Sequence, residues 1–280
     1  MRYRLGLVGK AIGQSRMPRL QRYLAQLHGF DLEYLLHDFE HIAAAQPMHY
    51  ILRLQDEGCD GLNVTHPFKQ AVVPLVSRAV VPDHAAVGAY NTLVFREGSI
   101  LGGNTDYSGF LRAWRYRFGG QLPGRVLLAG AGGVGHAVAH ALARLGAEQM
   151  LVADLDSGKA AALSTSLQGT AGDVQVIAAD AIADHMQQCD GLVNCTTLGT
   201  LQHPGSPFSA EHTGPQRWAF DAVYTPLHTT FLQQCRKAGL TTLTGFDLWI
   251  FQGVDAFNLF TGASISVDEQ VIETTLAWLD

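Results

Sequence analysis

A glycine-rich turn between an apolar strand and a helix, near the middle of the 280-residue chain, most strongly constrains the fold. Leu127 to Gly135 reads L-L-A-G-A-G-G-V-G, which fits G-x-G-x-x-G. The run 125–129 suits a buried parallel strand, and 134–145 has apolar residues at helical spacing. Such a strand, turn and helix receive a dinucleotide pyrophosphate on the free N–H groups of the helix N-terminus.

Each glycine of this turn has its own physical reason. Gly130 allows a tight turn, Gly132 lets the backbone approach the phosphates, and Gly135 lets helix and strand pack closely. The residues predicted to bind the dinucleotide here are Gly130, Ala131, Gly132, Gly133, Val134 and Gly135. The alternative is a glycine-rich turn that binds no ligand.

An acid at the end of the next strand bears on which dinucleotide is bound. Asp154 follows Gly135 by nineteen residues, where a carboxylate accepts hydrogen bonds from the adenosine ribose hydroxyls. A carboxylate repels the 2′-phosphate of NADP, whereas an arginine attracts it, and the next basic residue is Lys159. The sequence therefore predicts NAD over NADP.

Composition excludes several classes of partner. The net charge is −6 and no run of Lys or Arg occurs, so neither nucleic acid nor a membrane surface is expected as a partner. No segment reads as a signal peptide or membrane span. The four cysteines have no C-x-x-C spacing and the histidines form no metal pattern. We expect a cytoplasmic protein with reduced thiols and no metal, as a monomer or homodimer.

The order of predicted elements indicates an α/β protein of two domains. Before the glycine turn, strands are expected at 5–8, 61–65, 91–95 and 100–101, and helices at 18–28, 47–57 and 105–118. After it, strands are expected at 125–129, 149–153, 174–178, 191–194 and 218–221, and helices at 134–145, 157–167, 180–188, 227–238, 246–260 and 267–279.

This order predicts an N-terminal α/β domain with a mainly parallel sheet and a Rossmann-type domain after it. We place a substrate-binding catalytic domain at 1–104 and an NAD-binding domain at 105–240. The helices of 241–280 are expected to return to the first domain.

Three strings of polar residues lie at or after the ends of predicted strands in the first domain. They are G-L-N-V-T-H-P-F-K-Q at 61–70, G-A-Y-N-T-L-V-F at 88–95 and G-G-N-T-D-Y-S-G-F at 102–110. Open α/β sheets build their binding sites at strand ends.

These strings resemble the shikimate dehydrogenase family, which carries N-V-T-x-P-x-K, G-A-x-N-T and N-T-D-x-x-G-F in this order. Later segments agree: N-C-T-T-L-G at 194–199, D-A-V-Y-T-P-L-H-T-T-F-L at 221–232 and G-F-D-L-W-I-F-Q at 245–252. The resemblance covers nearly the whole chain and is nearest to the NAD-using quinate/shikimate branch. It implies hydride transfer between NAD and the C3 hydroxyl of shikimate, quinate or a close analogue, which are cyclic polyol carboxylates.

The resemblance also implies roles for individual residues. The catalytic pair carries over to Lys69 and Asp106, for which a surface ion pair is the alternative. Substrate contacts carry over to Ser15, Thr65, Asn91, Tyr224 and Gln252. The alternatives are a turn position for Asn91, strand and cap positions for Thr65 and Ser15, a helix surface for Gln252 and the core for Tyr224. On the cofactor side, the resemblance adds Thr196, Val223, Gly245 and Leu248.

The chain departs from the family where the substrate carboxylate is held. The family has two hydroxyl residues before a proline, whereas this chain reads S-R-M-P, with Ser15 kept and Met17 in the second position. One donor is lost, and Arg16 could compensate. Thr197 stands for the usual proline, and Leu248 for the usual methionine.

Two other functions stay open at this point. One is a protein of the same fold that senses NAD or a metabolite without catalysis. The loss of a substrate-binding hydroxyl at Met17 leaves this alternative open. The other is a two-domain folate dehydrogenase, which has its catalytic lysine in a different motif. The sequence leaves the exact substrate and the biosynthetic or catabolic direction undetermined.

Overall fold

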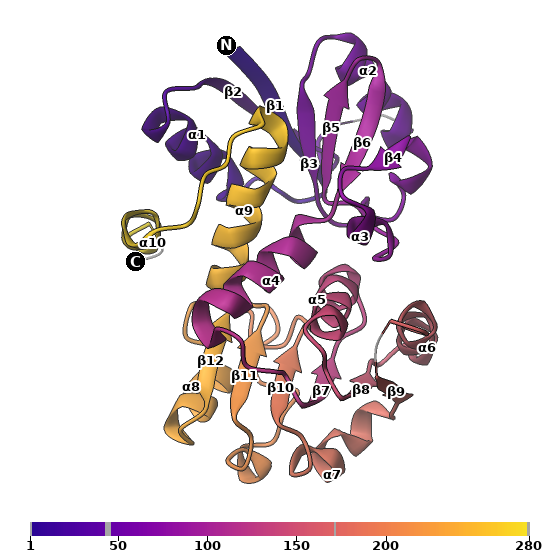
Figure 1. Ribbon diagram of the computed structural model, residues 1–280, viewed down its shortest axis with the longest axis vertical. Helices are drawn as coiled ribbons and strands as arrows, with labels where there is room; N and C mark the ends of the chain where they lie inside the picture. The colour runs from indigo at the N-terminus through magenta and orange to yellow at the C-terminus, as the bar shows by residue number, and fades with distance from the viewer. Residues whose placement is uncertain (1, 43–45, 171, 279–280) are drawn as a thin grey trace. The chain divides into compact units, whose positions relative to one another are not determined.

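The chain folds into two compact units, each built on its own six-stranded sheet (Figure 1). The computed structural model describes residues 2–42, 46–170 and 172–278. Unit 1 comprises residues 1–108 and 250–280, and unit 2 comprises 109–249. The divisions fall inside helices α4 (Thr105–Phe118) and α9 (Gly245–Thr261), whereas the predicted boundaries stood at 104/105 and 240/241. The predicted α/β class is confirmed.

The sheet of unit 1 has the strand order β2-β1-β3-β5-β6-β4. Its strands are β1 (Arg2–Gly9), β2 (Asp31–Asp38), β3 (Gly61–Val64), β4 (Arg78–Ala79), β5 (Thr92–Arg96) and β6 (Ser99–Gly103). Strand β1 pairs in parallel with β2 and β3, while β5 is antiparallel to β3 and β6. The β5–β6 hairpin turns at Glu97 and Gly98, which both have positive φ. This sheet places Asn91 and Asn104 at neighbouring strand ends.

Strand β2 was not predicted, because it lies at the sheet edge and is only partly buried. Of its residues, only Tyr34 and His37 are buried, so the apolar pattern of a core strand is missing. The helices of unit 1 are α1 (Met17–Leu27), α2 (Pro47–Asp56), α3 (Pro82–Ala85), part of α9 and α10 (Glu269–Leu276), with a 3₁₀ turn at Val73–Leu75. The predicted helix end at Leu279 lies outside the described residues.

Unit 2 holds a fully parallel sheet in the order β12-β11-β10-β7-β8-β9. Its strands are β7 (Arg125–Ala129), β8 (Gln149–Ala153), β9 (Asp173–Val176), β10 (Gly191–Asn194), β11 (Trp218–Asp221) and β12 (Thr241–Thr244). Four of the five strands predicted here, β7, β8, β10 and β11, have the predicted bounds, because each is a short, almost entirely buried run. The short strand β12 was not predicted.

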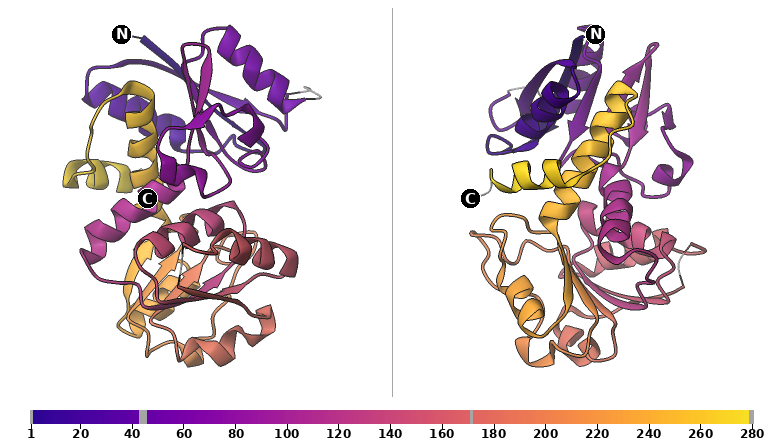
Figure 2. Two further views of the ribbon diagram at one scale, coloured as in Figure 1. Left: turned by 45° about the vertical axis from the view of Figure 1, so that its right-hand side comes forward. Right: turned by 60° about the vertical axis from the view of Figure 1, so that its left-hand side comes forward.

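Helices flank the sheet of unit 2 (Figure 2). They are α5 (Gly133–Arg144), α6 (Ser157–Ser166), α7 (Ile182–Met186) and α8 (Thr230–Lys237), with 3₁₀ turns at Ala179–Ala181 and Ala210–His212. The chain runs outward from β7 to β8 and β9 and then returns to β10 on the other side of β7. Such a reversal of strand order opens a crevice at the carboxyl ends of the strands, where ligands of these folds bind.

Candidate functional site

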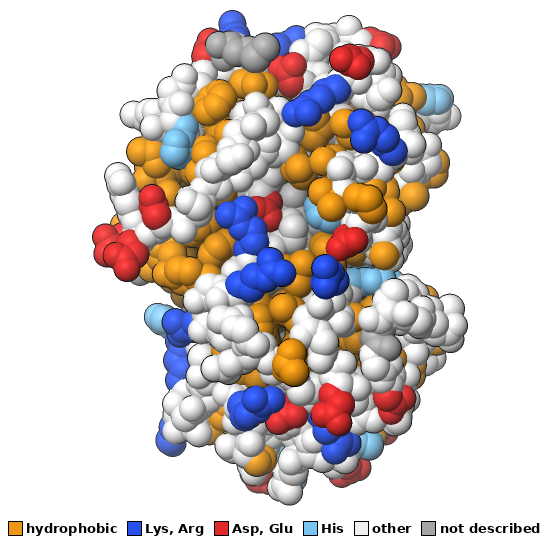
Figure 3. Space-filling model, in the orientation of Figure 1, with side chains coloured by type: hydrophobic (Ala, Val, Ile, Leu, Met, Phe, Trp, Pro, Cys, Tyr) orange, Lys and Arg blue, Asp and Glu red, His pale blue; other side chains and the backbone are white. Residues whose placement is uncertain are grey.

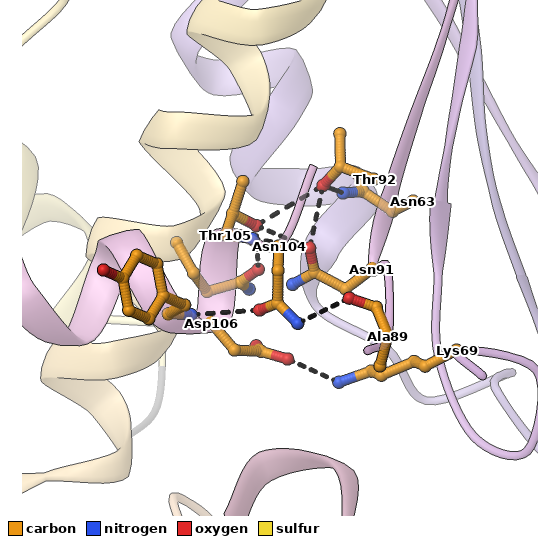
Figure 4. A network of polar contacts seen from close by, with 10 residues as sticks. Asn63, Lys69, Ala89, Asn91, Thr92, Asn104, Thr105 and Asp106 are labelled. Carbon is orange, nitrogen blue, oxygen red and sulfur yellow. Dashed lines mark hydrogen bonds and ion pairs between the residues drawn. The ribbon is translucent and has the colours of Figure 1, made fainter. Parts of the chain in front are cut away.

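Lys69 and Asp106 form a short ion pair in unit 1 (Figure 4). Lys69 follows β3, and Asp106 lies in the first turn of α4. The Lys69 Nζ donates to Asp106 Oδ2 at 2.6 Å, and their side chains are only 16% and 10% exposed. This is not the solvated surface pair that the sequence left open. A largely desolvated pair is held more firmly than an exposed one.

Asn91, just before β5, has its side-chain amide fixed by three donors. Its Oδ1 accepts from the Thr105 backbone N–H at 2.7 Å and lies 3.1 Å from both the Thr105 and the Thr92 hydroxyl oxygens. Asn91 is buried, and no described residue is hydrogen-bonded to its Nδ2. The amide therefore offers its N–H groups, and not its oxygen, to a ligand.

The network continues into residues that the sequence did not single out. The Tyr34 hydroxyl donates to Asn63 Oδ1 at 2.8 Å, and Asn63 Nδ2 donates to Thr92 Oγ1 at 3.4 Å. Gln252 on α9 joins it through Oε1, which lies 3.2 Å from the Thr105 hydroxyl. Asn63 and Thr92 could have been found from the sequence, because each is a polar residue in a predicted buried strand, and both are buried.

Ser15 lies in the loop between β1 and α1. It is half-buried, and its Oγ accepts from the Met17 N–H at 3.3 Å. The loop itself is fastened by Asp38, whose two oxygens accept from the Ala11 and Ile12 N–H groups at 2.9 Å each. The Glu40 N–H, which donates to Oδ1 at 3.0 Å, lowers the pKa of Asp38 most, and the bonds from Ile12 and Ala11 lower it further. Thr65, also half-buried, packs its methyl group against this loop at Gly9.

Met17 points into the body of unit 1 and not into solvent. It is 6% exposed, and Gln21 Nε2 lies 3.4 Å from its sulfur. Its methyl carbon lies 3.6 Å from the position that a Cβ would take at Gly253, next to Gln252 on α9. Met17 thus places an apolar group against α9 in the position where the family resemblance expects a hydroxyl.

The glycine turn of unit 2 has the geometry of an anion-binding helix start. Gly130 has φ +99°, and a Cβ there would lie 2.5 Å from the carbonyl carbon of Cys195. A Cβ at Gly135 would collide with the Gly130 carbonyl oxygen, whereas at Gly132 it would meet open space. No side chain caps α5, whose first turn contains Gly133 and Val134. Its N–H groups are therefore free to bind phosphate.

Asp154, directly after β8, reaches back to this turn. Its Oδ2 accepts from the Ala131 N–H at 2.7 Å, and its Oδ1 accepts from the Asp156 N–H at 2.9 Å. Each carboxylate oxygen has capacity for a further hydrogen bond, so a ribose hydroxyl can still be accepted. Asp154 thus has a structural task that the sequence did not reveal.

The other predicted cofactor residues follow β10, β11 and β12. Thr196 donates its hydroxyl to Asn194 Oδ1 at 2.7 Å. The Val223 N–H donates to Asp221 Oδ1 at 3.0 Å, and a Cβ at Gly245 would lie 2.8 Å from the Val223 carbonyl carbon. Leu248, one turn into α9, is buried. These residues line the carboxyl ends of neighbouring strands in unit 2.

Tyr224 also lies in unit 2, one residue beyond Val223. It is half-buried, and its ring is stacked on Trp249 with centroids 6.3 Å apart. The remaining predicted substrate residues all lie in unit 1.

Comparison with known proteins gives consistent matches. A profile described as the shikimate dehydrogenase substrate binding domain matches residues 7–93. The shikimate dehydrogenase (NADP(+)) of Streptomyces avermitilis is 39% identical over 264 residues, covering 93% of this chain and 90% of that protein. The quinate/shikimate dehydrogenase (NAD(+)) of Corynebacterium efficiens is 38% identical, covering 94% of each chain.

A solved structure agrees with these relatives. The quinate dehydrogenase of Corynebacterium glutamicum in complex with NAD superposes with a TM-score of 0.92. It is 36% identical in sequence and covers 99% of either chain.

Proposed function

Because this chain belongs to the shikimate dehydrogenase family of oxidoreductases, we propose that it transfers a hydride between NAD and the C3 hydroxyl of shikimate, quinate or a close analogue. The cofactor is a nicotinamide dinucleotide. Unit 1 is the substrate-binding catalytic part, and unit 2 binds the dinucleotide. The observation that carries the proposal is the buried Lys69–Asp106 contact at 2.6 Å.

Lys69 exchanges the proton of the reacting hydroxyl. When the alcohol is oxidised, the carbon loses hydride and the oxygen loses a proton, which the Lys69 amine accepts. In the reverse direction the Lys69 ammonium returns that proton to the carbonyl oxygen. Asp106, 2.6 Å from Nζ, orients the amine and accepts a hydrogen bond from the substrate hydroxyl. A fixed pair of this kind lowers the entropic cost of reaching the reactive geometry.

The neighbouring residues orient the substrate ring. Asn91 donates from Nδ2 to ring hydroxyls, because its oxygen is engaged by Thr105 and Thr92. Gln252 and Thr65 contact further hydroxyls, and Ser15 donates to the carboxylate. We also assign Tyr224 to the substrate carboxylate.

The glycine turn and Asp154 fit a bound NAD, which when present accepts or donates the hydride. The uncapped N-terminus of α5 binds the pyrophosphate, and the open space over Gly132 leaves room for it. Asp154 accepts from the ribose hydroxyls and disfavours a 2′-phosphate. Thr196, Val223, Gly245 and Leu248 line the nicotinamide end. We propose a preference for NAD, although both NAD- and NADP-named relatives match.

Steady-state assays of the wild-type protein test this function. Shikimate, quinate and amino-substituted or deoxy analogues are each paired with NAD and NADP, and reduced nicotinamide is followed by absorbance. We expect turnover of at least one cyclic polyol carboxylate with a higher kcat/KM for NAD. Binding of NAD without turnover of any member of the panel would contradict the proposal and favour a sensor.

A further inference from the structure

Asp106 depends on a short turn, residues 103–107, that joins β6 to α4. Asn104 is the fully buried centre of this turn. Its Oδ1 accepts from the Tyr107 N–H at 3.0 Å, as an N-cap does, and its Nδ2 donates to the Ala89 carbonyl at 2.9 Å. The side chain of Asn104 therefore fixes the first turn of α4, which presents Asp106 to Lys69.

The backbone N–H of Asn104 has a partner that the mechanism above does not use. It donates to Nδ1 of His84, on α3, at 3.1 Å (donor to acceptor). His84 is 5% exposed, and its ring packs edge-on against Tyr107 with centroids 5.7 Å apart. His84 thus contacts the residues that flank Thr105 and Asp106: its Nδ1 accepts from Asn104, and its ring packs against Tyr107.

This hydrogen bond assigns the tautomer of His84. A backbone N–H can only donate, so Nδ1 must be unprotonated and the ring proton must be on Nε2. If both ring nitrogens of His84 were protonated, its Nδ1–H and the Asn104 N–H would be two donors facing each other in a buried environment. The Asn104 N–H would then have no acceptor, which is costly for a buried backbone group.

We propose that His84 is a positioning residue for hydride transfer: its unprotonated Nδ1 holds the Asn104 N–H and so fixes the turn that sets Asp106 against Lys69. The inference rests on the proposed catalytic role of that pair. His84 does not touch the pair itself and acts only through Asn104 and Tyr107.

Several titratable groups lie on the elements around His84. Asp83 is its neighbour on α3 and favours the protonated ring, while burial acts more strongly and lowers the His84 pKa. The Tyr107 phenol packs from α4. Two strands also pack against α3: β4, which carries Arg78, and β6, which carries no titratable side chain. The unprotonated ring is therefore the stable form at neutral pH.

Three substitutions separate hydrogen bonding from packing. His84→Asn keeps an acceptor near the position of Nδ1, His84→Phe keeps a ring against Tyr107 without an acceptor, and His84→Ala keeps neither. We expect kcat to fall about tenfold or more in the Phe and Ala variants and to return to within about threefold of wild type in the Asn variant, since tenfold is the effect of about 1.4 kcal/mol. The Kd for NAD, measured without substrate, should be unchanged.

A pH profile gives a readout that a merely structural role would not change. In the direction of ketone reduction, in which Lys69 acts as the ammonium, wild-type kcat should fall in acid as His84 Nδ1 is protonated, and this acid limb should be absent or shifted to lower pH in His84→Asn. His140→Ala is the matched control. His140 is equally buried, at 5% exposure, and is bonded to Ser166 in unit 2. Its loss should leave kcat unchanged even if thermal stability falls.

Two measurements do not require activity. The ring nitrogen spectrum of His84 should show the Nε2–H tautomer, and amide exchange of Asn104 should accelerate in His84→Phe and His84→Ala but not in His84→Asn. The proposal is overturned if an active wild type shows the Nδ1–H tautomer. It is also overturned if the Phe variant keeps wild-type kcat, or if the Asn variant is as impaired as the Phe variant. An inactive wild type would instead overturn the proposed function.

Discussion

The orientation of single buried side chains decides which atoms of the site a ligand can meet. Asn91 is the clearest example, because donors from Thr105 and Thr92 engage its oxygen and turn its N–H groups outward. The sequence predicts a polar site at these positions from their place after strands. It cannot predict the direction of the amide, which depends on contacts between residues far apart in the chain.

Met17 is a second buried side chain whose chemistry affects substrate binding. We expect Met17→Ser to restore a donor to the substrate carboxylate and to lower KM for shikimate by about tenfold or more, since a hydrogen bond to a charged group contributes about 1.5–3 kcal/mol. Because Met17 is buried against α9, the same change should lower the free energy of unfolding by about 2–4 kcal/mol. Steady-state kinetics and urea unfolding measure the two effects separately.

Met17→Ala is the matched control, because it leaves a similar cavity without a hydroxyl. It should be destabilised equally and gain no affinity for shikimate. If Ala and Ser lower KM alike, the space matters and the hydroxyl does not. If neither changes KM, Met17 does not occupy the carboxylate position.

Among the elements, both units repeat one arrangement of strand, loop, helix and strand. An aspartate at the end of the second strand accepts a backbone N–H from the loop after the first strand. Asp38 binds Ala11 in unit 1, and Asp154 binds Ala131 in unit 2, at 2.9 and 2.7 Å respectively. Each also accepts from the N–H two residues further along the chain. A carboxylate in this position therefore fixes its loop, whether or not it also contacts a ribose.

Asp154 is proposed both to anchor the loop and to carry the charge that disfavours a 2′-phosphate, so two variants are needed to separate these roles. Asp154→Asn removes the charge but keeps one oxygen for the loop, whereas Asp154→Ala removes both. We expect the Asn variant to retain most NAD turnover while the ratio of kcat/KM for NAD to that for NADP falls about tenfold. An unchanged ratio in the Asn variant would exclude Asp154 as the discriminating charge, and loss of both activities only in the Ala variant would identify loop anchoring.

Asp221, at the end of β11, is a buried carboxylate whose protonation affects stability. The carboxylate is fully buried and accepts from Thr229, Asn194 and the Val223 N–H. Burial raises its pKa to about 6 despite these hydrogen bonds. The folded state thus binds a proton more tightly than the unfolded state, so this group's contribution to stability falls as pH rises from about 4 to 6.

The matching experiment is urea unfolding of wild type and Asp221→Asn at several pH values. The stability of the variant relative to wild type should rise by about 2 kcal/mol between pH 4 and 7. Taking the difference removes the opposite trend of the buried and half-buried histidines, whose lowered pKa values make stability fall as pH drops below about 6.5. A difference that does not vary with pH would contradict the raised pKa.

The elements also show why part of the fold could be predicted. Strands β7, β8, β10 and β11 were placed correctly, because strands covered on both faces read as continuous apolar runs. Strand β2 was missed, since most of its side chains are partly or fully exposed. The contact of His84 with Asn104 left no signal either, because it depends on α3 lying beside the start of α4.

For the whole molecule, the division into two units runs through α4 and α9. Composition and turn signals mark domain boundaries in loops, so a boundary within a helix leaves no such signal in the sequence.

On the face drawn in Figure 3, acidic side chains lie among basic ones. Within the described chain, none of the helices has the length and apolar character needed to cross a bilayer.

We propose that Lys69 and Asp106 of unit 1 move the proton while unit 2 binds the dinucleotide. Lys69→Ala and Asp106→Ala should each lower kcat by about 10²–10⁴-fold. The double variant should be little worse than either single one, because the residues act as a pair. Arg53→Ala is the control, since it breaks an exposed ion pair with Glu57 in the same unit and should leave kcat unchanged.

The most direct measurement is kcat of these variants with the preferred substrate, beside the Kd for NAD determined by titration without substrate. We expect kcat to fall by orders of magnitude while the Kd stays within about twofold of wild type. The proposed roles of Lys69 and Asp106 are wrong if either variant turns over at the wild-type rate, or if kcat falls only in proportion to weaker NAD binding.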